Sequence, residues 1–98
     1  MNIDYKKSQF ILGNQVEFLQ FMRSRAPLFH LSNVFLRDLH FTVIEFLKKK
    51  GMNVRQTEAE LVAREIGLQF ERKNIFRKLN GNTWVLLYPE FFMKKSTS

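Results

Sequence analysis

One run of residues, 32–50 (SNVFLRDLHFTVIEFLKKK), limits what this chain can fold into more than any other. Most of its positions are apolar, and a helix that is apolar over most of its circumference is surrounded by other elements. Ser32 or Asn33 can cap its start, and Gly51 suits its end. We therefore predict a central helix inside one small core, with a single polar stripe formed by Asp38, Thr42, Glu45 and Lys49.

The composition is that of a globular domain without cysteine. Of the 98 residues, 45% are hydrophobic and 14% are aromatic. We expect one domain, with its core at about residues 8–92 and frayed termini. The lack of cysteine excludes disulfides, thiolate catalysis and cysteine-ligated metals. No signal-peptide pattern and no apolar run of the ~20 residues that span a membrane is present, so we expect a soluble, cytoplasmic protein.

A first helix is predicted before the central one. It begins at Ser8 or Asn14 and runs to about Arg25, because Pro27 then breaks the helical pattern. Only Arg23 and Arg25 make its polar side basic, whereas helices that lie on membranes carry more cationic charge. We therefore expect this helix to pack in the core rather than on a membrane surface.

A third helix is predicted over residues 58–73. Thr57 and Glu60 have the spacing of a capping box, in which each side chain bonds a main-chain N–H at the other's position. Apolar residues follow at helical spacing, and Asn74 is suited to the left-handed conformation that ends a helix. The helix should therefore be continuous through Gly67.

After residue 74 the apolar pattern changes from helical to extended. Residues 75–79 and 82–88 flank Asn80-Gly81, a strong signal for a two-residue hairpin turn. Pro89 cannot continue a central strand. We therefore expect an α+β fold of three helices followed by a C-terminal two-stranded hairpin. Its predicted cross-strand pairs are Leu79 with Asn82, Arg77 with Trp84, and Ile75 with Leu86.

Two parts of the chain resemble the winged-helix branch of the helix-turn-helix proteins. In TEAELVAREIGLQF, Ala63 and Gly67 are four residues apart, as in many helix-turn-helix sequences, and ERKNIFRKLNGNTWVLL is similar to the close of a helix followed by a wing. The pattern departs from the family at Lys73, where an apolar residue is expected. The resemblance implies a winged-helix-like domain that acts by binding.

Features needed for catalysis are not found in this sequence. Acidic residues are scattered singly along helix faces, whereas catalysis needs polar groups that converge in a cleft. His30 and His40 have no further metal ligands at helical spacing, and no glycine-rich phosphate loop is present. We therefore expect no enzymatic activity, no metal, no cofactor and no small-molecule substrate.

The charge of the chain favours nucleic acid as a partner. Its formal net charge is +7, and basic small domains often bind phosphate. Acidic residues at the front of the third helix, Glu58, Glu60 and Glu65, disfavour entry into a major groove. We therefore predict contact with the nucleic-acid backbone without sequence reading. The residues expected to make it are Lys48, Lys49, Arg72, Lys73, Arg77 and Lys78.

A protein partner or a homodimer is the alternative. In the predicted register both faces of the hairpin are apolar, whereas an exposed wing should be polar on one side. Either the leading helix and the tail with Phe91 and Phe92 cover the second face, or a partner does. Arg77 opposite Trp84 could form a cation–π pair or a nucleic-acid contact. The residues expected at a protein interface are Trp84, Val85 and Leu87.

Overall fold

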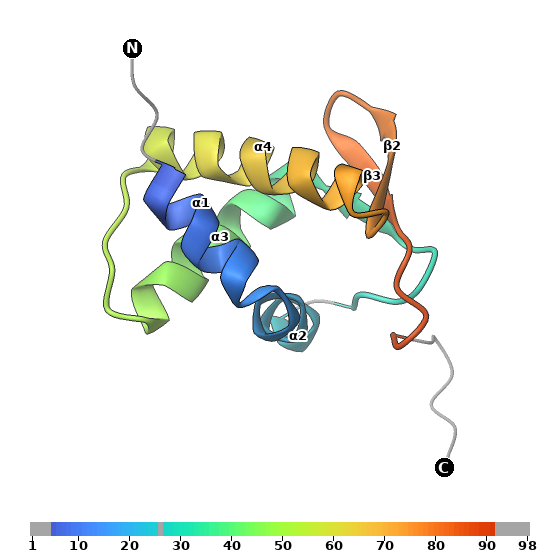
Figure 1. The fold of residues 1–98 in the computed structure, drawn as a ribbon, viewed down its shortest axis with the longest axis horizontal. Coiled ribbons are helices and arrows are strands. Elements are labelled where there is room, and N and C mark those ends of the chain that lie inside the picture. The colour runs from blue at the N-terminus through green and yellow to red at the C-terminus, as the bar shows by residue number, and fades with distance from the viewer. Residues whose placement is uncertain (1–4, 26, 92–98) are drawn as a thin grey trace.

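The computed structural model describes residues 5–25 and 27–91, which form an α+β fold (Figure 1). Four helices and a three-stranded antiparallel sheet lie within these residues, so the predicted fold class is confirmed but the predicted number of helices and strands is wrong. In chain order the elements are α1 (Tyr5–Gly13), α2 (Gln15–Arg25), β1 (Asn33–Phe35), α3 (Leu36–Lys49), α4 (Gln56–Arg72), β2 (Phe76–Asn80) and β3 (Thr83–Leu86).

The strand that was not predicted, β1, consists of residues that were expected to begin the central helix. The sheet has the order β1-β3-β2, and Val34 of β1 pairs with Trp84 of β3. Beside this pair, the Leu31 N–H donates to the Leu86 carbonyl at 2.7 Å, and the Leu86 N–H donates to the Ser32 carbonyl at 2.9 Å. This pairing satisfies main-chain groups along β3 that would otherwise lie at an open sheet edge. The helix α3 therefore begins only after the strand.

α3 lies in the core, as predicted for the central helix. Leu39, Val43 and Phe46 are fully buried on it. The Phe46 ring lies 6.3, 5.3 and 5.7 Å from three rings of α1 and α2, those of Phe10, Phe18 and Phe21. Phe41, however, is 54% exposed, so the other elements surround α3 only in part.

The predicted first helix is divided in two at Asn14. Its side-chain amide donates to the Phe10 carbonyl at 2.8 Å, and its main-chain N–H donates to the Ile11 carbonyl at 2.9 Å. These bonds end α1 and start α2 in a different direction (Figure 1). α1 includes residues that were expected to fray, because it packs on α4, where Lys7 Nζ lies 3.2 Å from Glu58 Oε2.

α4 is continuous through Gly67, as predicted, and Asn74 beyond it has the left-handed φ of 61°. The predicted capping box, however, is wrong. The N-cap residue is Arg55, and no side chain caps the first turn. Thr57 therefore lies within the first turn of the helix rather than at its N-cap position.

Because Thr57 caps nothing, replacing it with alanine should change the free energy of unfolding by less than about 0.5 kcal/mol. The loss of a true N-cap costs about 1 kcal/mol. Urea denaturation measures the difference. Ser32→Ala is the matched variant, because the Ser32 hydroxyl donates to the Phe29 carbonyl at 2.7 Å and accepts from the Phe29 N–H at 3.0 Å. That variant should lose about 1 kcal/mol. An equal loss in Thr57→Ala would contradict the observed helix start.

The hairpin forms where it was predicted, but its predicted register is wrong. Asn80 pairs with Thr83, so that Gly81 and Asn82 make the turn. The Asn80 side-chain oxygen accepts the Asn82 N–H at 2.9 Å, which holds the turn in this position. An irregularity between Lys78 and Asn80 interrupts the ladder. The remaining pairs are Lys78 with Trp84, Arg77 with Val85, and Phe76 with Leu86.

This register decides which side chains of the hairpin face the core. Residues opposite each other in an antiparallel pair point to the same face of the sheet. Phe76, Trp84 and Leu86 therefore point inward, and the Phe76 ring lies 5.1 Å from the Phe70 ring of α4. Arg77 and Val85 point to the outer face, so the predicted pairing of Arg77 with Trp84 does not occur.

The C-terminal segment packs against α2. Phe91 is buried, its ring lies 4.9 Å from the Tyr88 ring, and the Arg23 guanidinium lies 4.4 Å above it. Phe91 is thus packed within the chain, but on Tyr88 and Arg23 rather than on the hairpin strands, and Phe92 lies outside the described residues. Among the residues that the structure describes, none of the helices has the length and apolar character of a membrane span.

Candidate nucleic-acid interface

Several basic side chains of the helices and their ends lie close to carboxylates of neighbouring residues. Ion pairs join α1 to α4 and α2 to α3, and others lie within α3 and α4. The pairs within the described residues are Lys7–Glu58, Arg25–Glu45, Arg37–Asp38, Lys50–Glu17 and Arg64–Glu60. At the hairpin end of α4, by contrast, four exposed cations form no ion pair with any described residue: Arg72, Lys73, Arg77 and Lys78.

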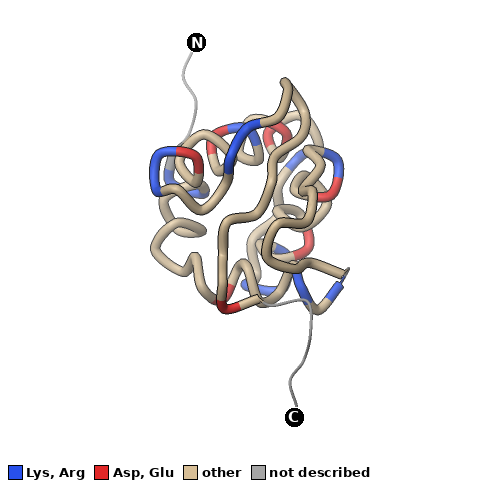
Figure 2. The backbone as a smooth tube through the Cα atoms, turned by 90° about the vertical axis from the view of Figure 1, so that its right-hand side faces the viewer, with Lys and Arg blue, Asp and Glu red and all other residues tan. Residues whose placement is uncertain are grey.

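These four residues, here called the hairpin-end cluster, occupy the connection from α4 to β2. Arg72 ends α4, Lys73 is its C-cap, and Arg77 and Lys78 follow in β2. The left-handed Asn74 turns the chain between them, and the Ile75 N–H bonds back to the Phe70 carbonyl at 2.8 Å. Figure 2 faces this end of the molecule and shows the two basic segments close to one another.

The cluster extends around both sides of a sheet edge. Successive side chains of a strand point to opposite faces. Lys78 pairs with Trp84 and so lies on the inner side, whereas Arg77 pairs with Val85 and lies on the outer side. Because β2 is an edge strand, both side chains can reach an anionic chain that follows this edge.

The other two predicted contact residues lie elsewhere. Lys48 and Lys49 are at the end of α3, at the lower left of Figure 1, whereas the hairpin lies beyond the end of α4, at the upper right. Lys49 Nζ lies 5.3 Å from the centre of the Phe21 ring, and the Arg25 guanidinium lies 5.4 Å from it. The structure therefore brings together four of the six predicted residues and separates the other two from them.

The three residues predicted for a protein interface do not form an exposed surface. Trp84 is 3% exposed and Val85 is 7% exposed, while Leu87 is half-buried. The Trp84 indole lies over Gly67, and its Nε1 donates to Glu71 Oε2 at 2.7 Å. The inner apolar face of the hairpin is thus covered by α4 of the same chain.

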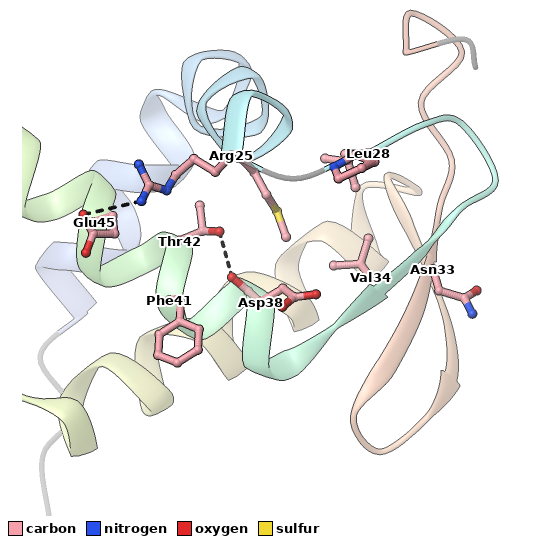
Figure 3. Close-up of a pocket in the computed structure, with 10 residues that line it drawn as sticks. Arg25, Leu28, Asn33, Val34, Asp38, Phe41, Thr42 and Glu45 are labelled. Atoms are coloured by element: carbon pink, nitrogen blue, oxygen red, sulfur yellow. Dashed lines mark hydrogen bonds and ion pairs between the residues drawn. The ribbon is translucent and has the colours of Figure 1, made fainter. Parts of the chain in front are cut away.

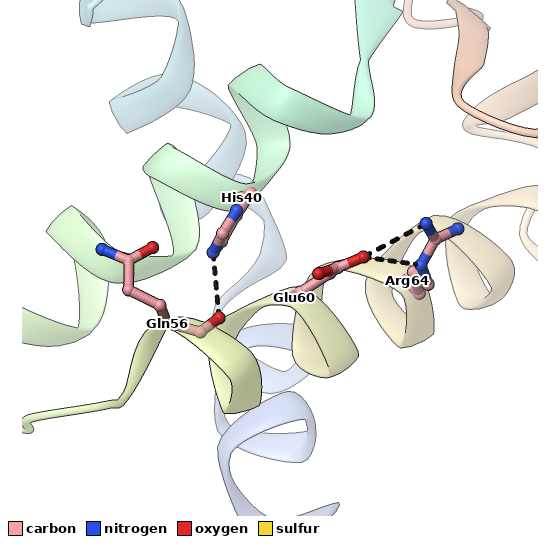
Figure 4. A network of polar contacts seen from close by, with 4 residues as sticks. All are labelled: His40, Gln56, Glu60 and Arg64. Carbon is pink, nitrogen blue, oxygen red and sulfur yellow. Dashed lines mark hydrogen bonds and ion pairs between the residues drawn. The ribbon is translucent and has the colours of Figure 1, made fainter.

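The start of α4 is acidic, as expected, but its carboxylates Glu58 and Glu60 form ion pairs with Lys7 and Arg64. Arg64 Nη2 lies 3.2 Å from Glu60 Oε2, and His40 Nε2 lies 3.1 Å from the Gln56 carbonyl oxygen (Figure 4). Arg64 is therefore occupied by a carboxylate on its own helix. This arrangement disfavours the reading of base edges by the first turns of α4.

A groove that sequence reasoning missed runs beside the polar stripe of α3. It has a volume of ≈ 330 Å³ and lies between the end of α2, residues 27–34 and α3 (Figure 3). Asp38, Thr42 and Glu45 form one wall, but the Thr42 hydroxyl donates to the Asp38 carbonyl at 2.7 Å, and Arg25 lies 4.0 Å from Glu45. The stripe was visible in the sequence, whereas the groove depends on how α2 packs on α3.

Metal-ligand groupings are the other kind of site that the described residues could form. Within the described ranges, no three His, Asp or Glu side chains are grouped as metal ligands would be. Comparisons with protein-family models, with curated proteins and with solved structures found no match. The hairpin-end cluster is therefore the candidate site that the charges and geometry of this chain support best.

Proposed function

We propose that this protein is a non-enzymatic binding module that contacts the nucleic-acid backbone through the hairpin-end cluster. The observation that carries the proposal is the distribution of ion pairs. Lys7, Arg25, Arg37, Lys50 and Arg64 are paired with carboxylates, whereas Arg72, Lys73, Arg77 and Lys78 lie together at one end of the molecule, exposed and without such partners among the described residues. Free lysine and arginine side chains of this kind neutralise phosphates and release counterions.

The arrangement of the elements also supports the proposal. A helix that ends beside a hairpin, with cations on both, is compatible with the winged-helix resemblance of the sequence. The exposed face of α4 carries Leu61, Arg64 and Leu68, of which Arg64 is paired with Glu60. Such a face has few groups for reading base edges. The proposed binding is therefore directed to phosphates and is independent of sequence.

A salt titration of binding to random-sequence duplex DNA tests this function. Each neutralised phosphate contributes about −0.9 to the slope of log affinity against log salt. Four contacts predict a slope of about −3.6, whereas all six residues predicted from the sequence would give about −5.4. Fluorescence anisotropy measures the slope. The absence of binding at low salt would overturn the proposed function, and a slope near zero would exclude phosphate contact as its basis.

A further inference from the structure

The outer face of the sheet carries an exposed aromatic ring. β1 has the burial pattern exposed, buried, exposed, so that Phe35 and Asn33 point away from the core. Phe35 is 45% exposed, although a large apolar side chain is usually covered. The hairpin lies at one end of the molecule, and the helices lie on one side of it (Figure 1). Phe35 therefore presents part of its ring to solvent, whereas the β3 residues on the same side of the sheet, Thr83 and Val85, are buried.

This face also carries a cation of the hairpin-end cluster. Across the sheet, Phe35 pairs with Thr83, and in the next row Asn33 pairs with Val85, which in turn pairs with Arg77. Phe35 and Arg77 therefore lie diagonally on the same outer face, on the two edge strands. The middle strand β3 lies between them, so a nucleic-acid strand that crosses the sheet can contact both. Exposed aromatic rings and cations on one surface are the combination with which proteins bind single-stranded nucleic acid.

A hollow next to Phe35 supplies polar groups. It has a volume of ≈ 600 Å³ and lies between the start of α3, the middle of α4 and the hairpin turn. Asn82 and Thr83 line it together with Arg37 and Arg64, so that hydrogen-bond donors and acceptors are near the ring. Figure 4 shows the part of its wall formed by His40, Glu60 and Arg64.

We infer that the outer sheet face binds single-stranded nucleic acid, with a base stacked on Phe35 and the backbone passing toward Arg77. This inference rests on the proposed function and names its substrate class. A base inside a duplex is stacked between its neighbours, so it cannot lie on a protein ring, whereas an unpaired base can. The hollow then receives the polar edge of the stacked base. Duplex DNA reaches only the cations of the hairpin-end cluster.

Fluorescence anisotropy with labelled oligothymidylate, oligouridylate and a random-sequence duplex tests the inference. At least one of the two single strands should bind more tightly than the duplex. Comparison of oligothymidylate with oligouridylate shows whether DNA or RNA is preferred. Phe35→Ala should weaken single-strand binding by about 5- to 100-fold, the effect of losing one stacked base, and change duplex binding by less than about twofold. Phe41→Ala is the matched control, because Phe41 is also exposed, at 54%, but lies on α3. It should leave both affinities unchanged.

Two further variants separate stacking from folding. Phe35→Leu keeps apolar bulk at the start of α3 and should lose single-strand affinity like the alanine variant, whereas Phe35→Trp should retain it. Circular dichroism checks that each variant is folded. Equal affinity for single strands and duplex, with no effect of Phe35→Leu, would overturn the inference and leave the proposed function standing. No binding to any probe would overturn both.

Discussion

Replacing Gly67 with alanine is expected to destabilise this protein, although alanine is the better helix former. A Cβ at this position would lie 2.5 Å from Trp84 Cζ2 and 2.9 Å from Trp84 Cη2. The indole has little room to move, because Nε1 bonds Glu71 at 2.7 Å and the ring lies 5.5 Å from that of Phe76. Forcing an extra carbon into a packed core costs about 1–3 kcal/mol, and the helix propensity of alanine returns up to about 1 kcal/mol.

We expect a net loss of about 1 kcal/mol in the free energy of unfolding of Gly67→Ala, measured by urea denaturation. Gly13→Ala is the matched control, because a Cβ there has no heavy atom within 4 Å. That variant should be unchanged or slightly more stable. Equal stabilities of the two variants would show that the indole does not press on α4.

The clash can also be located directly. Cζ2 and Cη2 belong to the six-membered ring of the indole. Phenylalanine in place of Trp84 has a smaller side chain, whose ring would not reach as far toward Gly67. In a Trp84→Phe background, Gly67→Ala should therefore cost less than it does in the unmodified protein. A double-mutant cycle measures this coupling, which is typically 0.5–3 kcal/mol for residues in contact. Additive effects of the two substitutions would contradict the contact.

The second large effect is expected in nucleic-acid binding. Arg77→Glu combined with Lys78→Glu removes two of the four cations of the hairpin-end cluster and places carboxylates beside the phosphates. The salt slope should fall in magnitude by about 2, because each lost phosphate contact reduces it by about 1. Binding near physiological salt should become undetectable. Both side chains are exposed, so the fold should be retained.

Lys48→Glu combined with Lys49→Glu is the control for this variant. It changes the formal net charge by the same amount, but at the C-terminal end of α3, away from the hairpin-end cluster. Interactions between exposed charges are largely screened beyond about 8 Å at physiological salt. The control should therefore reduce affinity only slightly. Equal losses in the two variants would mean that net charge, rather than the hairpin-end cluster, governs binding.

The contrast between these two pairs explains what could be predicted of the site. Arg72, Lys73, Arg77 and Lys78 are neighbours in the chain, separated by one turn, so their proximity follows from sequence distance alone. The position of Lys48 and Lys49 depends instead on the direction of α3 relative to α4. The end of α3 lies on the side of the molecule away from the hairpin, so these lysines are separated from it (Figure 1). The apolar and basic pattern of each helix carries no information about that direction.

Phe35 shows the same limit. In the sequence it lies within an apolar run that has helical spacing, so a buried helical position was expected. Pairing with β3 converts residues 33–35 into a strand, and the alternation of a strand turns Phe35 outward while Val34 turns inward. A one-residue difference in register likewise moved Arg77 to the outer face, because the Asn80 side chain bonds the Asn82 N–H.

The features that depend on short stretches of chain could be predicted from the amino-acid sequence. These are the α+β class, the continuous α4 with its stop at Asn74, the place of the hairpin, and the local density of cations around it. Tertiary structure alone decided the third strand, the strand register, the break between α1 and α2, and which of the predicted cations lie together. The physical reason is that periodicity, caps and turns act within a few residues, whereas strand pairing and helix packing depend on which distant segment satisfies a main-chain group or covers an apolar face.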